Sequence, residues 1–379
     1  MATRRSDDIR KGGFRAALLL FGACAVAASL LWLWRHFPPA GAIDFYIIWG
    51  QAQVAGRAHP ANKYDPISQN EIGEELYARA MQSGSEAWRF DARQRRGLDS
   101  TATPLLYTAF GWLPRDYERA LALFRMLLIV AFVAGVLVLA RVARLGAAMA
   151  LFITAALVRF YKPLHMDVYV GNVGALQVLG LASFLAASPR FPATAAAILT
   201  LTIGFKPNLL PILILIVVVR ITTRDFARLR REVIAGACAG IAGFAISSLH
   251  YRSPRIWLDW LGAAGDFYSR LPGREWNNVA PALALYQRYG IDWSHAVTLV
   301  LLVIGVAIVL RRRSDALAVA LGILVYLISA PTVWLQYLVL LVPAAFGLVA
   351  AGNGPARFPP RRPRPRLSDE LSEADRESS

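Results

Sequence analysis

The sequence predicts an all-α protein that crosses a membrane several times. Three observations lead to this fold class. Hydrophobic residues make up 56% of the 379 residues and charged residues only 17%, whereas soluble domains carry about 25% charged residues. Apolar runs long enough to cross a bilayer, about 17–25 residues, recur along the chain. Basic residues gather in the short segments between these runs.

The apolar runs divide the chain into about ten predicted spans. Several are short, and short spans with Pro at their ends are tolerated where they line a cavity within the protein. The first is too long for a cleaved signal segment, so we expect it to be retained. The predicted spans are residues 14–34, 119–140, 147–162, 172–188, 191–205, 207–220, 232–249, 295–310, 314–330 and 332–350.

The distribution of charge predicts the orientation. The net charge is +16, but the basic residues cluster in alternate short loops and the tails, which is the positive-inside pattern and no sign of nucleic-acid binding. We therefore expect a multi-pass protein of the cell inner membrane with both termini cytoplasmic. Residues 1–13 form the N-terminal segment, 14–350 the membrane domain and 351–379 a disordered tail, while 35–118 and 250–294 are long outer loops.

The metal-ligating residue types show no pattern of a metal site. Cys24 and Cys238 fall inside apolar runs, so we expect both to be unpaired, buried hydrophobic residues. The histidines are isolated, neither HxxxH nor DxD occurs, and no Gly-rich strand–helix turn is present. The sequence predicts neither a metal nor another cofactor.

Asp44 follows directly on the first span and opens the string "DFYIIWGQAQVAGR". Phe45, Ile48 and Trp49 share a face at helical spacing, which predicts a short amphipathic helix lying along the outer interface. Asp44 then has two interpretations, an N-cap of this helix or a catalytic carboxylate. Asp65 has a simpler one, because it precedes Pro66 at a predicted helix start.

Further motifs lie at the predicted outer ends of spans. "TATPLLYTAFGWLP" is apolar but too short to cross, which suits a re-entrant or interfacial segment. "FKPNLLPILIL" places Lys206 between two short apolar runs that Pro207 and Pro211 interrupt. Lys206 is either a snorkelling lysine at a helix end or a ligand-binding cation.

Taken in order, "DFYIIWGQAQVAGRAHPANKYDP", "TPLLYTAFGWLP", "GNVGALQVL", "FKPNLLPILIL" and "SAPTVWLQYLVLLVP" resemble glycosyltransferase family 87. The resemblance covers about Asp44 to Pro343 and implies the GT-C architecture, similar to polyprenyl-phosphate-mannose-dependent α-mannosyltransferases. It implies that a sugar, mannose or a related hexose, passes from a polyprenyl monophosphate to a lipid or glycan acceptor hydroxyl at the outer face. It also implies that Asp44 is the base. Two positions depart from the family pattern: Gln336 stands where His is frequent, and Asn172 where Gln is usual.

Glycosyl transfer from a lipid phosphate needs a base for the acceptor, donors for the departing phosphate and a surface for the sugar. Asp44 is the predicted base. The candidates for the phosphate are Lys206 first, then Arg125 and Lys162. The candidate sugar or acceptor contacts are aromatic and amide side chains: Trp49, Tyr64, Asn172, Trp276, Asn277, Trp334 and Gln336.

Two other functions remain open on the sequence. A flippase for lipid-linked sugars or polysaccharides would share a basic, aromatic outer cavity but would not need Asp44. A non-catalytic assembly factor is the second. Release of a labelled sugar from its polyprenyl carrier distinguishes the transferase from both.

Overall fold

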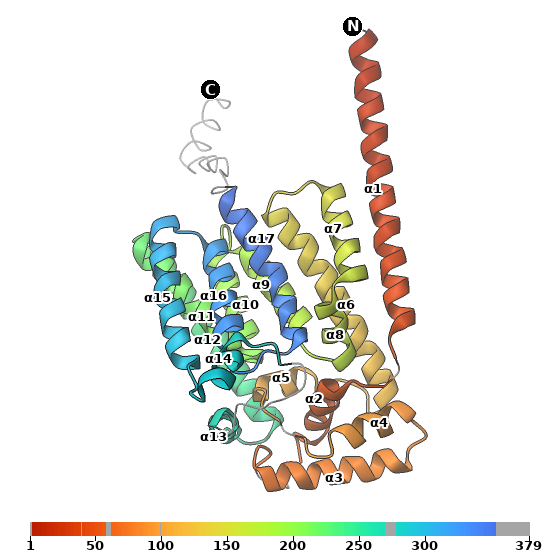
Figure 1. Ribbon diagram of the computed structural model, residues 1–379, viewed down its shortest axis with the longest axis vertical. Helices are drawn as coiled ribbons and strands as arrows, with labels where there is room; N and C mark the ends of the chain where they lie inside the picture. The colour runs from red at the N-terminus through yellow and green to blue at the C-terminus, as the bar shows by residue number, and fades with distance from the viewer. Residues whose placement is uncertain (1, 39, 58–61, 99, 270–277, 354–379) are drawn as a thin grey trace, which may run out of the picture.

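The computed structural model describes the chain except residues 1, 39, 58–61, 99, 270–277 and 354–379. All regular elements of the described part are helices, and its one β-bridge joins Asn278 to Trp334. This confirms the predicted all-α fold. Most helices run side by side as a bundle, and a layer of short helices covers one end of it (Figure 1).

The bundle contains every segment predicted as a span. Within the described residues, five helices are long and apolar enough to cross a membrane, or six if the bent pair α7–α8 counts as one span. The other four segments are shorter apolar helices, so the number of crossings stays a prediction. The bundle helices are α1 (Ala2–His36), α6 (Tyr117–Val142), α7 (Ala147–Phe160), α8 (Lys162–Val170), α9 (Gly174–Ala187), α10 (Pro192–Phe205), η1 (Pro207–Leu209), α11 (Leu210–Thr222), α12 (Phe226–His250), α15 (Ser294–Arg312), α16 (Asp315–Ser329), η2 (Leu335–Leu340) and α17 (Leu341–Gly352).

The layer at the end of the bundle is built mainly from residues 43–109. It comprises α2 (Ile43–Val54), α3 (Pro66–Gln82), α4 (Glu86–Gln94) and α5 (Pro104–Ala109), with α13 (Ile256–Ser269) and α14 (Pro281–Tyr289) beside them (Figure 1). Asp65 caps α3 by accepting from the backbone N–H groups of Ile67 and Ser68, and Pro66 is the first residue of the helix. The predicted helix start is therefore confirmed.

Two expectations about exposure were wrong. α2 is not an amphipathic helix at the interface: Phe45, Tyr46 and Trp49 are all buried, because α4, α5 and α8 pack around it. Cys24 and Cys238 are free but exposed rather than buried. Their helices, α1 and α12, expose many large apolar side chains, such as Leu20 and Ile241, so an apolar residue there can face lipid as well as the protein core.

Close packing within the bundle depends on glycine at particular positions. A Cβ on Gly322 in α16 would lie 2.7 Å from the backbone nitrogen of Ile212 in α11. A Cβ on Gly135 in α6 would lie 3.1 Å from the backbone nitrogen of Leu179 in α9. Small residues allow helices to approach this closely in a membrane, where packing rather than the hydrophobic effect holds them together. These contacts hold α16 against α11 and α6 against α9.

Candidate active site

The carboxylate of Asp44 faces a neighbouring segment and does not cap its own helix. The N-cap of α2 is Ala42, and no side chain caps the helix. Asp44 Oδ2 instead accepts from Asn172 Nδ2 at 3.0 Å, and the side chain of Gln336 donates a second hydrogen bond. Of the two interpretations of Asp44, the structure therefore contradicts the cap.

Asn172 lies on the turn between α8 and α9. Gly171 before it has φ +73°, the left-handed conformation that favours glycine, and a Cβ there would meet the side chain of Phe45 at 2.4 Å. The turn therefore packs directly against the start of α2. Asp167 holds the other side of the turn by accepting from the backbone N–H groups of Gly174 and Ala175, at 3.1 and 2.8 Å. These contacts on both sides of the turn fix the position of Asn172 beside Asp44.

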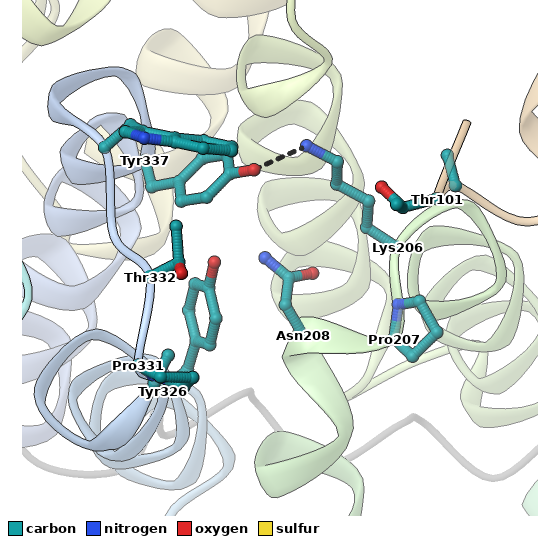
Figure 2. A pocket seen from close by; sticks show the side chains of 11 residues that line it. Thr101, Lys206, Pro207, Asn208, Tyr326, Pro331, Thr332 and Tyr337 are labelled. Carbon is teal, nitrogen blue, oxygen red and sulfur yellow. Dashed lines mark hydrogen bonds between the residues drawn. The ribbon is translucent and has the colours of Figure 1, made fainter. Parts of the chain in front are cut away.

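Lys206 lies where the chain breaks between α10 and η1, as Pro207 predicts. Its ammonium donates to Asn172 Oδ1 at 2.8 Å and to the hydroxyl of Tyr337 at 3.3 Å, and it lies 4.6 Å from the centre of the Tyr337 ring. The side chain is turned into the protein, toward Tyr337 (Figure 2). This placement is unlike a snorkelling lysine, whose head group reaches for water.

The amide of Asn172 joins the carboxylate to the ammonium. It donates to Asp44 from Nδ2 and accepts from Lys206 at Oδ1, so each end of the amide matches the charge that it meets. The two partners lie 128 and 34 residues away along the chain. We call Asp44, Asn172, Lys206, Gln336 and Tyr337 the outer cluster, after the side of the membrane that the charge pattern predicts for it.

A pocket opens beside Lys206, with a volume of about 100 Å³. A water molecule needs about 10–15 Å³ measured in this way, so there is room for a small polar group. The other lining residues come from the 101–102 segment, η1, the end of α16, the loop after it and η2: Thr101, Ala102, Pro207, Asn208, Tyr326, Ala330, Pro331, Thr332, Trp334 and Tyr337. Figure 2 shows the hydroxyls of Thr332 and Tyr326 on the side of the pocket facing Asn208.

Residues 330–334 form one wall of this pocket, and a segment far away in the sequence holds them in place. Asn278 donates from Nδ2 to the carbonyl of Pro331 at 3.1 Å and accepts from the backbone N–H of Val333 at 2.9 Å. The backbone N–H of Val279 donates to the carbonyl of Val333 at 2.7 Å. On the opposite side, Thr103 donates through its hydroxyl to the carbonyl of Gly204, next to Lys206. The pocket is therefore preformed.

Burial controls the ionisation of Asp44. Removal from water raises the pKa of its carboxyl above the ordinary value. The positive charge of Lys206, that of Arg95 and the hydrogen bonds from Gln336 and Asn172 act in the opposite direction. A carboxylate with a raised pKa holds a proton more strongly than an exposed one, which makes it a stronger general base.

The two secondary candidates for the phosphate lie elsewhere. Arg125 is buried in α6 and donates to the backbone carbonyls of Pro38 and Tyr169, at 2.9 and 3.2 Å, so its guanidinium ties the chain before α2 to the end of α8. Lys162 is exposed at the first residue of α8. Of the three predicted cations, the structure brings only Lys206 to Asp44.

The predicted sugar contacts divide into three groups. Asn172 and Gln336 belong to the outer cluster, and Trp334 lines its pocket. Trp49 and Tyr64 are buried in the layer of short helices, where their side chains donate to the carbonyls of Pro114 and Ala102, each at 2.9 Å. Trp276 and Asn277 lie outside the described residues.

Sequence reasoning missed two polar residues of the site, Tyr337 and Asn208. Tyr337 contacts Lys206, and Asn208 lines the pocket while its Oδ1 accepts from Gln177 Nε2 at 2.9 Å. Both lie within strings already singled out, "WLQY" and "FKPN". In the described ranges no three His, Cys, Asp or Glu side chains gather as metal ligands would.

The comparison with family models decides the class of protein. The model of glycosyltransferase family 87 matches residues 102–353, about two thirds of the chain and most of the helix bundle. The chain belongs to glycosyltransferase family 87. No curated protein and no solved structure matches it.

This family 87 member is therefore a membrane glycosyltransferase. The matched range includes Asn172, Lys206 and Gln336, but Asp44 lies before it. The case for Asp44 consequently depends on the contacts described above, in which it meets residues of the matched range.

Proposed function

We propose that this protein transfers a hexose, such as mannose, from a polyprenyl monophosphate to an acceptor hydroxyl at the outer face of the membrane. The observation that carries the proposal is the bridge from Asp44 through Asn172 to Lys206, beside a preformed pocket. It combines a half-buried carboxylate and a positively charged donor, which are the two groups that this reaction needs. The outer orientation follows from the basic residues in the alternate loops.

The chemistry follows from the two charges. Asp44 takes the proton of the acceptor hydroxyl as its oxygen attacks the anomeric carbon of the sugar. The bond between that carbon and the phosphate oxygen breaks, and the phosphate leaves with the bonding electron pair. The ammonium of Lys206 stabilises the negative charge that gathers on the phosphate. The hydroxyl of Tyr337 and the amide of Asn172 hold the ammonium in place.

The test is transfer from a labelled donor. Purified protein in detergent is incubated with polyprenyl-phosphate-linked mannose that carries the label on the sugar, and with membrane lipids as acceptors. Appearance of the label in a new lipid or glycan, with release of polyprenyl phosphate, supports the proposal. A panel of other carrier-linked hexoses identifies the sugar. Movement of intact donor between the leaflets of a vesicle, with the label still on the carrier, would point to a flippase instead.

A further inference from the structure

A second pocket lies on the other side of α2 from Asp44, within the layer of short helices. Its lining residues are Trp49, Gln53, Arg57, Leu76, Arg79, Trp88 and Arg115, none of which lines the pocket beside Lys206. With 3.6 residues per turn, Trp49 and Gln53 lie about 140° and about 180° around the helix from Asp44. The two pockets are therefore separate, and of the two only the second is lined by residues of α2.

The second pocket is positively charged. Arg57 and Arg79 both pair with Glu75, at 2.6 and 2.5 Å, so one carboxylate serves two guanidinium groups. Arg115 is an exposed third arginine. Its neighbour Asp116 caps α6 by accepting from a backbone N–H. With three arginines against these two acids, an excess of positive charge remains for an anion.

The aromatic side of this pocket is held rigidly. Trp49 donates from Nε1 to the carbonyl of Pro114 at 2.9 Å, which fixes the turn that carries Arg115. Trp88 meets the Trp49 ring edge-on, with ring centres 5.3 Å apart, and stacks on Tyr117 at 6.0 Å. Two indole rings in fixed positions and three arginine side chains thus line one cavity.

We propose that this second pocket binds a sugar phosphate. Guanidinium groups bind phosphate through paired hydrogen bonds, and rigid indole rings provide the large, partly apolar wall on which a sugar ring can rest. The buried Nε1 of Trp88 has no hydrogen-bond partner within the described residues, and a ligand oxygen that reaches it would satisfy this donor. The inference goes beyond the proposed transfer reaction, and its test does not depend on transfer.

Calorimetry on the full-length protein in phosphatidylcholine nanodiscs tests the proposal. The probes are glucose 6-phosphate, glucose and inorganic phosphate. We expect saturable binding of glucose 6-phosphate that is at least about tenfold tighter than binding of either other probe, because only this ligand engages both the arginines and the indole rings. Equal binding of inorganic phosphate, or no binding of glucose 6-phosphate, would overturn the proposal.

Substitutions assign the binding to this pocket. Arg115→Gln should weaken it by about tenfold, since it removes one charge-assisted contact. Arg119→Gln is the matched control, because Arg119 is exposed one turn further on and does not line the pocket. Glu75→Gln should tighten binding, since it removes the acid that pairs with Arg57 and Arg79. Equal loss in the two arginine variants, or weaker binding in Glu75→Gln, contradicts the assignment.

A final experiment identifies the natural source of the phosphate group that this pocket binds. The binding of glucose 6-phosphate is measured again in nanodiscs that contain phosphatidylglycerol. If a lipid headgroup occupies the pocket, phosphatidylglycerol should reduce binding by the wild type and have little effect on the residual binding by Arg115→Gln. That result makes a phospholipid headgroup the natural source. Unchanged binding makes it a soluble or glycan-linked sugar phosphate.

Discussion

Two clusters of charged side chains lie at opposite ends of the helix bundle, and they differ in what joins their charges. The outer cluster holds one carboxylate and one ammonium, joined through an amide. The other, which we call the inner cluster, consists of Arg220, Arg228, Glu232 and Asp315. α16 connects the two ends: it begins at Asp315 and ends at Ser329, about 22 Å away at 1.5 Å per residue.

The inner cluster pairs every charge directly. Arg220 contacts Glu232 at 2.8 Å and Asp315 at 2.5 Å, and only 3% of its side chain is exposed. Arg228 contacts the same two carboxylates, at 2.8 and 3.2 Å. Two positive and two negative charges therefore form a closed network that ties α11, α12 and α16 together.

The outer cluster is open by comparison. Asp44 and Lys206 both contact the neutral amide of Asn172, and a pocket lies beside Lys206. A closed network has no capacity left for a substrate, whereas charges that meet through a neutral amide can exchange this partner for a ligand. We therefore expect the inner cluster to stabilise the fold and the outer cluster to act in the proposed reaction.

The largest expected effect that tests this contrast comes from replacing Asp44. We expect Asp44→Asn to lower the rate of transfer by about 10²- to 10⁴-fold, the contribution of a general base, while the protein still inserts and folds. Asp65→Asn is the control, because Asp65 is a true helix cap and Asn caps as well as Asp. Turnover of labelled donor is the measurement. Near wild-type turnover in Asp44→Asn would remove the base from the mechanism.

The inner cluster should show the opposite pattern, a loss of stability. Arg220→Met leaves Glu232 and Asp315 with one cation, Arg228, in place of two, so the free energy of unfolding should fall by about 3–5 kcal/mol. Arg230→Met, an exposed change of the same kind in the same region, should have little effect. Unfolding in detergent measures both variants. If Arg220→Met is as stable as Arg230→Met, the inner cluster is not what ties these helices together.

Lys206 should show an intermediate effect on turnover. Loss of a charge-assisted hydrogen bond to the departing phosphate, about 1.5–3 kcal/mol, predicts that Lys206→Met is about 10- to 100-fold slower. Lys206→Arg should be impaired less, because the planar guanidinium keeps the charge but needs a different geometry. The loss should appear with the phosphate-linked donor and leave acceptor affinity unchanged. Lys162→Met serves as the control, and normal turnover in Lys206→Met would return the phosphate role to Lys162 or Arg125.

The smallest effect concerns pH. Transfer needs Asp44 without its proton, so the rate should rise with pH through its pKa, which burial raises above the ordinary value. Asn172 stabilises the charged form by donating to it, and Asn172→Ala should therefore move this rise to higher pH, by roughly one unit or less. The pH dependence of the rate at saturating donor measures the shift. A rise that stays in place or moves to lower pH would contradict the role of this hydrogen bond.

Predictions from local sequence were correct where residues close together in the chain determine the structure. Asp65 followed by Pro66 starts a helix because a carboxylate satisfies the first N–H groups and proline needs no donor there. Pro207 interrupts the chain between α10 and α11 because it lacks the N–H that a continuous helix requires. The ten apolar segments likewise became helices.

Apolar character alone does not say what surrounds a side chain. The aromatic residues of α2 were expected among lipid headgroups, yet they are packed inside the protein. Cys238 was expected in the protein interior and is exposed on α12. Lipid and a protein core are both apolar solvents for a side chain, so hydropathy cannot separate them. The neighbours of each helix determine whether its side chains face lipid or the protein core.

The sequence by itself therefore determined the all-α membrane fold, the family and several helix ends, since these depend on composition and on residues near one another in the chain. It also singled out Asp44, Asn172 and Lys206 one at a time. Only the tertiary structure decided that these three form one bridge, that Arg125 binds backbone carbonyls elsewhere, and that Trp49 lines a different pocket. The physical reason is that hydrogen-bond partners 128 residues apart are brought together by helix packing, and helix packing depends on the shapes of many side chains at once.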